Sequence, residues 1–191
     1  MKAVLVQSEH VDQAPSGKHH DNTAARLQLQ DNPPARLLLG VLRILFGITF
    51  LWAFFDKLFG LGKATPSENA WVNGGDPTFG YLSNNGGTFA SFFTGLAGQG
   101  WVTWLFMLGL LGIGVALIAG AGMRIAAITG GLLYLFMWLA SFPLGNNPFI
   151  DDHLTGALMV VFFALVGAGD TLGIGSWWKN TSIVRRMPLL R

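Results

Sequence analysis

The chain has 191 residues, of which 51% are hydrophobic and 12% are charged, and its mean hydropathy is +0.47. Soluble domains carry about a quarter charged residues, so these proportions indicate an integral membrane protein. The net charge of +2 is too small for a nucleic-acid-binding surface, and no nucleic-acid partner is expected. The lack of cysteine excludes disulfides, iron–sulfur clusters, c-type haem attachment and persulfide chemistry within this chain.

Residues 1–35 form a polar tail with too few apolar side chains to offset the entropy of ordering. We expect this tail to be disordered and cytoplasmic. His19 and His20 suggest a metal site, but the tail offers no further ligands at a suitable spacing. No metal is therefore expected there.

Four apolar blocks follow the tail, each close to the roughly 20 residues that a membrane-spanning helix needs. They cover residues 37–55, 102–119, 125–142 and 150–168. The connections at 120–124 and 143–148 are short and rich in helix breakers, so consecutive helices should be antiparallel neighbours. The blocks predict an all-α membrane protein whose residues 36–178 form a four-transmembrane-helix up-down bundle.

Lysine and arginine are concentrated in the N-terminal tail, in the 120–124 connection and in a basic C-terminal tail, residues 179–191. The other two connections hold only Lys57 and Lys63 as basic residues. Basic residues favour the cytoplasmic side of a membrane. We therefore expect a multi-pass protein of the cell membrane with both termini in the cytoplasm.

The connection from residue 60 to residue 100 is far longer than an ordinary helix–helix loop. It is rich in Gly, Asn, Ser and Thr, yet it also carries Trp71, Tyr81 and four phenylalanines. The aromatic content predicts an ordered cap on the extracytoplasmic mouth of the bundle, with residues 89–96 as a short interfacial helix. A plain lid and a ligand-binding cap both fit this pattern.

The first block contains RLLLG at 36–40 and FLWAFFDKL at 50–58, which are similar to the opening helix of the DoxX/DoxD family of four-helix integral membrane proteins. The loop sequence WVNGGDPTFGYLS at 71–83 resembles its "WLNGG-PT-GFL" segment. NNPFIDDH at 146–153 and GAGDTLGIGSWW at 167–178 resemble its "NPF-D-H" and "G-TLGLG-WW" signatures.

The resemblance implies a membrane subunit of a quinone-linked oxidoreductase of the thiosulfate, thiol or oxidative-stress type. One family member is the membrane subunit of an archaeal thiosulfate:quinone oxidoreductase. Because this chain lacks thiols, the sulfur chemistry would lie on a protein partner in a membrane complex. The alternative is a non-catalytic scaffold or accessory subunit of a respiratory or stress-response complex, so whether the chain is part of an enzyme stays open.

Ionisable residues lie within or at the ends of the apolar blocks at three places. Arg43 lies about two turns inside the first block, so it either faces the bundle interior or extends to the nearby cytoplasmic surface. Asp56 closes the same block, either as a solvated helix end or as part of a site. Asp151 and Asp152 can cap the fourth helix, but capping does not explain His153. A metal on these three residues would be crowded at one helix start.

We predict that Asp56, Trp71, Asp152 and His153 converge on one quinone site beneath the cap, with Arg43 as a further cofactor-binding residue. Odd and even helices run antiparallel, so the end of the first and the start of the fourth reach the same surface. A histidine beside carboxylates suits proton transfer to a bound quinone. Haem is not expected, because bis-histidine ligation needs two placed histidines. The alternative is a helix cap without chemistry.

Overall fold

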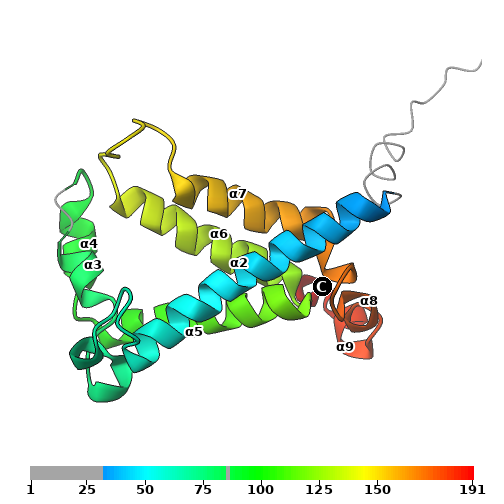
Figure 1. Ribbon diagram of the computed structural model, residues 1–191, viewed down its shortest axis with the longest axis horizontal. Coiled ribbons are helices and arrows are strands. Elements are labelled where there is room, and N and C mark those ends of the chain that lie inside the picture. The colour runs from blue at the N-terminus through cyan, green and yellow to red at the C-terminus, as the bar shows by residue number, and fades with distance from the viewer. Residues whose placement is uncertain (1–31, 85–86) are drawn as a thin grey trace, which may run out of the picture.

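The computed structural model of the protein describes residues 32–84 and 87–191, and the secondary structure in these two ranges is helical (Figure 1). The predicted disorder of the N-terminal tail concerns residues that lie almost entirely outside the described ranges. His19 and His20 lie outside them as well.

Four long helices run back and forth along the molecule: α2 (Pro33–Phe59), α5 (Gly100–Ala119), α6 (Met123–Ala140) and α7 (Asp152–Leu165). The first three have 27, 20 and 18 residues and are long and apolar enough to cross a membrane. The fourth has 14 residues, or about 21 Å at a rise of about 1.5 Å per residue, against a hydrocarbon core of about 30 Å. The protein is therefore an all-helical membrane protein with three candidate spans and a shorter apolar helix in the fourth predicted block.

Local capping explains where the helices differ from the apolar blocks. Asn32 accepts a hydrogen bond from the Ala35 N–H and two prolines fill the first turn, so α2 begins before its apolar stretch. Gly60, with φ of 65°, ends α2. Asp151 caps the start of α7, and the chain leaves the helix before Gly167, which has φ of 67°. These two residues shorten the fourth predicted block.

The long helices pack in two pairs, α2 with α5 and α6 with α7 (Figure 1). Small residues set the distance within each pair. A Cβ on Gly47 of α2 would lie 3.0 Å from the carbonyl oxygen of Gly114 in α5, and one on Gly156 of α7 would lie 2.9 Å from the Tyr134 ring in α6. Apolar side chains gain little by leaving lipid, so such close backbone approach is what packing in a membrane requires.

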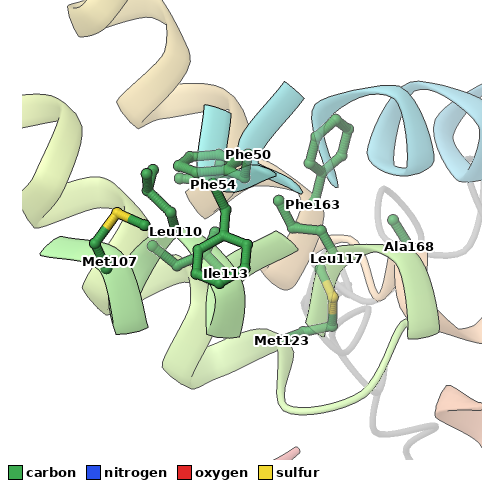
Figure 2. Close-up of a cluster of buried hydrophobic side chains, with 10 residues drawn as sticks. Phe50, Phe54, Met107, Leu110, Ile113, Leu117, Met123, Phe163 and Ala168 are labelled. Atoms are coloured by element: carbon green, nitrogen blue, oxygen red, sulfur yellow. The ribbon is translucent and has the colours of Figure 1, made fainter. Parts of the chain in front are cut away.

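A buried apolar core joins the four helices. Figure 2 shows Phe50 and Phe54 of α2 gathered with Met107, Leu110, Ile113 and Leu117 of α5 and Phe163 of α7. The outward-facing side is also apolar: Leu105, Leu158 and Leu165 are 66%, 65% and 79% exposed. Exposed leucines of this kind on long apolar helices indicate a lipid environment.

The long connection between α2 and α5 is largely ordered. It contains two 3₁₀ turns, η1 (Ser67–Asn69) and η2 (Trp71–Asn73), and two short helices, α3 (Phe79–Ser83) and α4 (Ala90–Leu96). The helix predicted at 89–96 corresponds to α4. Its Phe93 is 4% exposed and packs with Leu82 of α3 and Ala140 at the end of α6.

The chain after α7 returns to the end of the molecule where α2 begins (Figure 1). It forms η3 (Ala168–Asp170), α8 (Gly175–Trp178), α9 (Ser182–Arg186) and η4 (Pro188–Leu190). Arg124 at the start of α6 holds the last residues of the chain in place. The Arg124 N–H donates to the Arg191 carbonyl at 2.8 Å, and the Arg124 guanidinium donates to the Pro188 carbonyl at 2.9 Å. The basic C-terminal segment is thus folded against the helices.

Candidate functional site

Arg43 lies inside the protein. It is fully buried, and its guanidinium donates to the carbonyls of Leu117 and Ile118 at the end of α5, and to those of Thr171 (3.1 Å) and Leu172 (2.9 Å) after η3. This decides between the two alternatives for Arg43: it faces the interior and does not extend to the surface. Its Nε has no hydrogen-bond partner in the described part of the chain.

The glycine-rich motif at 167–178 folds around this guanidinium. A Cβ on Gly173 of this motif would lie 3.1 Å from Arg43 Nη2. On the other side, a Cβ on Gly120, which ends α5, would lie 3.0 Å from Arg43 Nη1. Leu172 has φ of 52°, a backbone region that non-glycine residues rarely occupy. Arg43 therefore holds a tight turn against α5. That it also binds a cofactor stays a prediction.

Asp56 is buried as well, with 1% exposure. Its carboxylate accepts hydrogen bonds from the backbone N–H groups of Lys63 (3.3 Å) and Ala64 (3.2 Å). The interpretation of Asp56 as a solvated helix end is therefore wrong. The chain turns back over the end of α2 and covers this carboxylate, which in return satisfies two loop N–H groups.

Trp71 lies beside an aspartate that the sequence did not single out. Its ring meets Trp104 of α5 edge to face at 4.6 Å between centroids. Nearby, Asp76 Oδ1 accepts hydrogen bonds from the Thr78 N–H (2.9 Å), the Thr78 hydroxyl (2.8 Å) and the Thr103 hydroxyl (2.8 Å). The Asp76-Pro-Thr78 spacing is typical of such an Asx turn and could have identified this residue.

The hydrogen bonds to Asp76 stabilise its ionised form. Burial by itself would raise the pKa of Asp76, but the hydrogen bonds from Thr103 and Thr78 outweigh burial and hold the pKa below its ordinary value. Asp76 is therefore ionised at neutral pH. Thr103 is buried in α5, so this carboxylate also fastens the long connection to the start of that helix.

His153 pairs with Asp151. The His153 Nδ1 lies 2.7 Å from Asp151 Oδ2, while Asp151 Oδ1 accepts a hydrogen bond from the Leu154 N–H at 2.9 Å. Asp152, the residue named from the sequence, lies 3.6 Å from the same nitrogen, and its side chain is 92% exposed. The Tyr134 ring of α6 stands 6.3 Å from the imidazole between centroids. Asp151 is thus both the helix cap and the closer carboxylate.

The environment of Asp151 favours its ionised form. Burial would raise its pKa, but the hydrogen bonds from the Leu154 N–H and from His153, together with the charge of His153, lower the pKa below the ordinary value. Asp151, Asp152 and His153 offer ligand atoms within 4.8 Å of one another. Because both Asp151 oxygens already have partners, this group is better described as a hydrogen-bonded pair than as a metal centre.

The described hydrogen bonds, ion pairs and ring contacts do not join Asp56, Trp71 and His153 directly to one another. The described contacts of Asp56 are to residues 63 and 64, those of Trp71 include Trp104, and those of His153 are to Asp151, Asp152 and Tyr134. Convergence of Asp56, Trp71 and His153 on one ligand stays a prediction.

No protein-family model, curated protein or solved structure matches this chain. The membrane class rests on the apolar helices, and function must be inferred from the residues of the chain itself.

Proposed function

We propose that this chain is the membrane subunit of a quinone-linked oxidoreductase, as its resemblance to the DoxX/DoxD family suggests. The observation that supports this function best is the pair of His153 and Asp151 at the start of α7. The His153 side chain is 20% exposed and stands beside Tyr134, so it is largely sheltered yet still open to a ligand or to water.

A quinone headgroup makes specific demands on a protein. Its reduction to a quinol takes up two electrons and two protons, so its carbonyl oxygens need hydrogen-bond donors connected to water. The two ring nitrogens of a histidine let it pass a proton between a ligand and water, and the neighbouring carboxylate orients the His153 ring. In this proposal His153 donates to the quinone, Asp151 positions His153, and a protein partner oxidises the sulfur compound and supplies the electrons.

The proposal includes a fourth membrane-spanning segment built on α7. This helix buries Val160 and Phe163 completely against its neighbours. The chain that follows it is non-helical, but Ala168 and Gly169 of η3 are buried in protein. Irregular backbone at membrane depth is tolerated under that condition. Apolar Phe149 and Ile150, which precede the Asp151 cap, extend the hydrophobic length at the other end.

The proposal also places the end with α3 and α4 outside the cytoplasm, as a cap on the bundle. The Tyr81 hydroxyl donates to the Met137 carbonyl at 3.2 Å, and Phe93 packs against the end of α6. The opposite end gathers Arg36, Arg124 and the basic C-terminal segment. Positive charge at one end favours a cytoplasmic location for that end and so for both termini.

A specific observation also supports a second function, that of a non-catalytic scaffold. Two cavities in the described ranges, of about 110 and 160 Å³, are lined by residues other than His153. The remaining surface of the long helices is strongly apolar, as a subunit that holds partners within a membrane would require. A scaffold would copurify with proteins but without quinone.

Quinone analysis of the purified protein separates the two functions. The protein is extracted from its native membrane in mild detergent, and bound quinone is measured by mass spectrometry in wild type, His153→Ala and Thr155→Ala. Thr155 lies on the same helix end, but its hydroxyl bonds only to the backbone of Asp151 and Asp152. We expect quinone in wild type and Thr155→Ala and its loss in His153→Ala, with the fold retained in both variants. Wild-type protein without quinone, or quinone retained in His153→Ala, would contradict the proposed function.

A further inference from the structure

A cavity of about 160 Å³, widely open to the surface, lies where the long connection meets the start of α5. It is lined by Trp71, Gly75, Asp76, Gly100, Thr103 and Trp104. A single water needs roughly 10–15 Å³ by a comparable measure, so the cavity has room for a group of several heavy atoms.

The lining combines one negative charge with two aromatic rings. Asp76 is held ionised by the hydroxyls of Thr78 and Thr103, and the lining contains neither lysine nor arginine. The rings of Trp71 and Trp104 meet edge to face, so they stand at a steep angle to each other, 75° between planes. The one formal charge in the lining is therefore negative, which favours a cation over an anion.

The hydrogen bonds that attach the long connection to α5 account for the position of Asp76. They do not account for Trp71 and Trp104 in the cavity lining. Trp104 remains 57% exposed although it borders the cavity, and its neighbour Trp101 is 61% exposed. Exposed tryptophans near the end of a membrane helix are typical of the headgroup region. The cavity thus opens at the depth where lipid headgroups lie.

We propose that this cavity binds an ammonium group, held by the Asp76 carboxylate and by the faces of Trp71 and Trp104. A cation within about 6 Å of a tryptophan ring is attracted by the π electrons, and a nearby carboxylate adds direct charge attraction. Two sources share this chemistry: the headgroup of phosphatidylethanolamine and a free organic amine. The site is independent of the proposed quinone chemistry, since the described contacts of His153 involve none of the lining residues.

The two sources are compared on the full-length protein in a neutral detergent. Thermal stability is measured against increasing short-chain phosphatidylethanolamine, against phosphatidylglycerol with the same chains, and against free ethanolamine. Wild type is compared with Trp104→Leu and Trp101→Leu, two exposed tryptophans on the same helix of which only Trp104 lines the cavity. Asp76→Asn is added as a test of the charge.

We expect saturable stabilisation of wild type by phosphatidylethanolamine or by ethanolamine, and none by phosphatidylglycerol. A response to the lipid alone assigns a headgroup, and a response to ethanolamine alone assigns a free amine. Trp104→Leu should weaken binding roughly 3- to 30-fold, whereas Trp101→Leu should not change it. Asp76→Asn should abolish binding, and if that variant does not fold, Trp104→Leu decides. Equal stabilisation by the anionic lipid, no response to either amine, or identical behaviour of the two tryptophan variants would overturn the proposal.

Discussion

The guanidinium of Arg43 donates to the carbonyl of Leu172 at 2.9 Å, across 129 positions of sequence. Leu172 has the only positive φ of a non-glycine residue in the described ranges, 52°. A charged side chain in the middle of α2 thus supports a strained turn at the other end of the chain. The same guanidinium also donates hydrogen bonds to carbonyls at the end of α5. The carbonyls in the last turn of a helix have no partners within the helix, so they need donors from elsewhere.

We predict that Arg43→Leu destabilises the protein by more than about 3 kcal/mol, because several buried carbonyls lose a charged donor at once. Arg43→Lys should also destabilise it, since one ammonium cannot reproduce the planar spread of a guanidinium. Thermal unfolding in detergent measures both. Leu45→Ala serves as the control, because Leu45 lies on the same helix and is 53% exposed. An Arg43→Leu protein as stable as the control would show that these hydrogen bonds contribute little.

Two glycines of α5 should respond differently to the same substitution. A Cβ at Gly114 would lie 2.8 Å from the Leu51 side chain and 3.0 Å from its backbone nitrogen, whereas a Cβ at Gly112 meets nothing within 4 Å. We expect Gly114→Ala to cost about 1–3 kcal/mol by forcing α2 and α5 apart, and Gly112→Ala to be neutral or slightly stabilising because alanine favours a helix more than glycine does. Unfolding curves of the two variants in one detergent test this, and equal stability would argue against close packing of α2 on α5.

The lowered pKa of Asp76 predicts a stability change in acid. Its ordinary pKa is 3.8, and folding lowers it, so the carboxylate stabilises the folded state above that pH. This contribution is lost as the pH falls through the lowered pKa. Melting temperature measured from roughly pH 2 to 6 should therefore fall more steeply in acid for wild type than for Asp76→Asn. Glu68→Gln, which removes an exposed carboxylate from the same connection, should behave like wild type.

The orientation of the two ends can be read by cysteine labelling, because the chain contains no cysteine of its own. Asn84 and Asn180 are both exposed, and they follow α3 and α8, which lie at opposite ends of the long helices (Figure 1). We predict that an impermeant thiol reagent labels Asn84→Cys in intact cells and labels Asn180→Cys only in inverted vesicles, as the distribution of basic residues implies. The reverse pattern would place both termini outside the cytoplasm.

Hydrophobic pattern predicted the long helices well because membrane helices depend on length and apolar content more than on partners. The predicted blocks at 102–119 and 125–142 differ from α5 and α6 by two residues at most at either end. The fourth block was predicted too long, since apolar residues continue past the point where the backbone leaves the helix near Gly167. Apolar side chains occur both in helices and in irregular buried segments, so hydropathy alone does not locate the end of the helix.

The sequence by itself determined that this is a helical membrane protein, because composition and span length follow directly from the cost of placing polar groups in lipid. Only the tertiary structure decided what the charged residues do. From the sequence, Arg43 and Asp56 could each face either solvent or the protein interior. The structure buries both side chains and bonds them to backbone groups of other segments. Asp76 likewise bonds to Thr103, 27 positions along the chain, whereas His153 pairs with Asp151 only two residues away. A side chain's partner depends on which segments the fold brings within about 3 Å, and spacing along one helix does not contain that information.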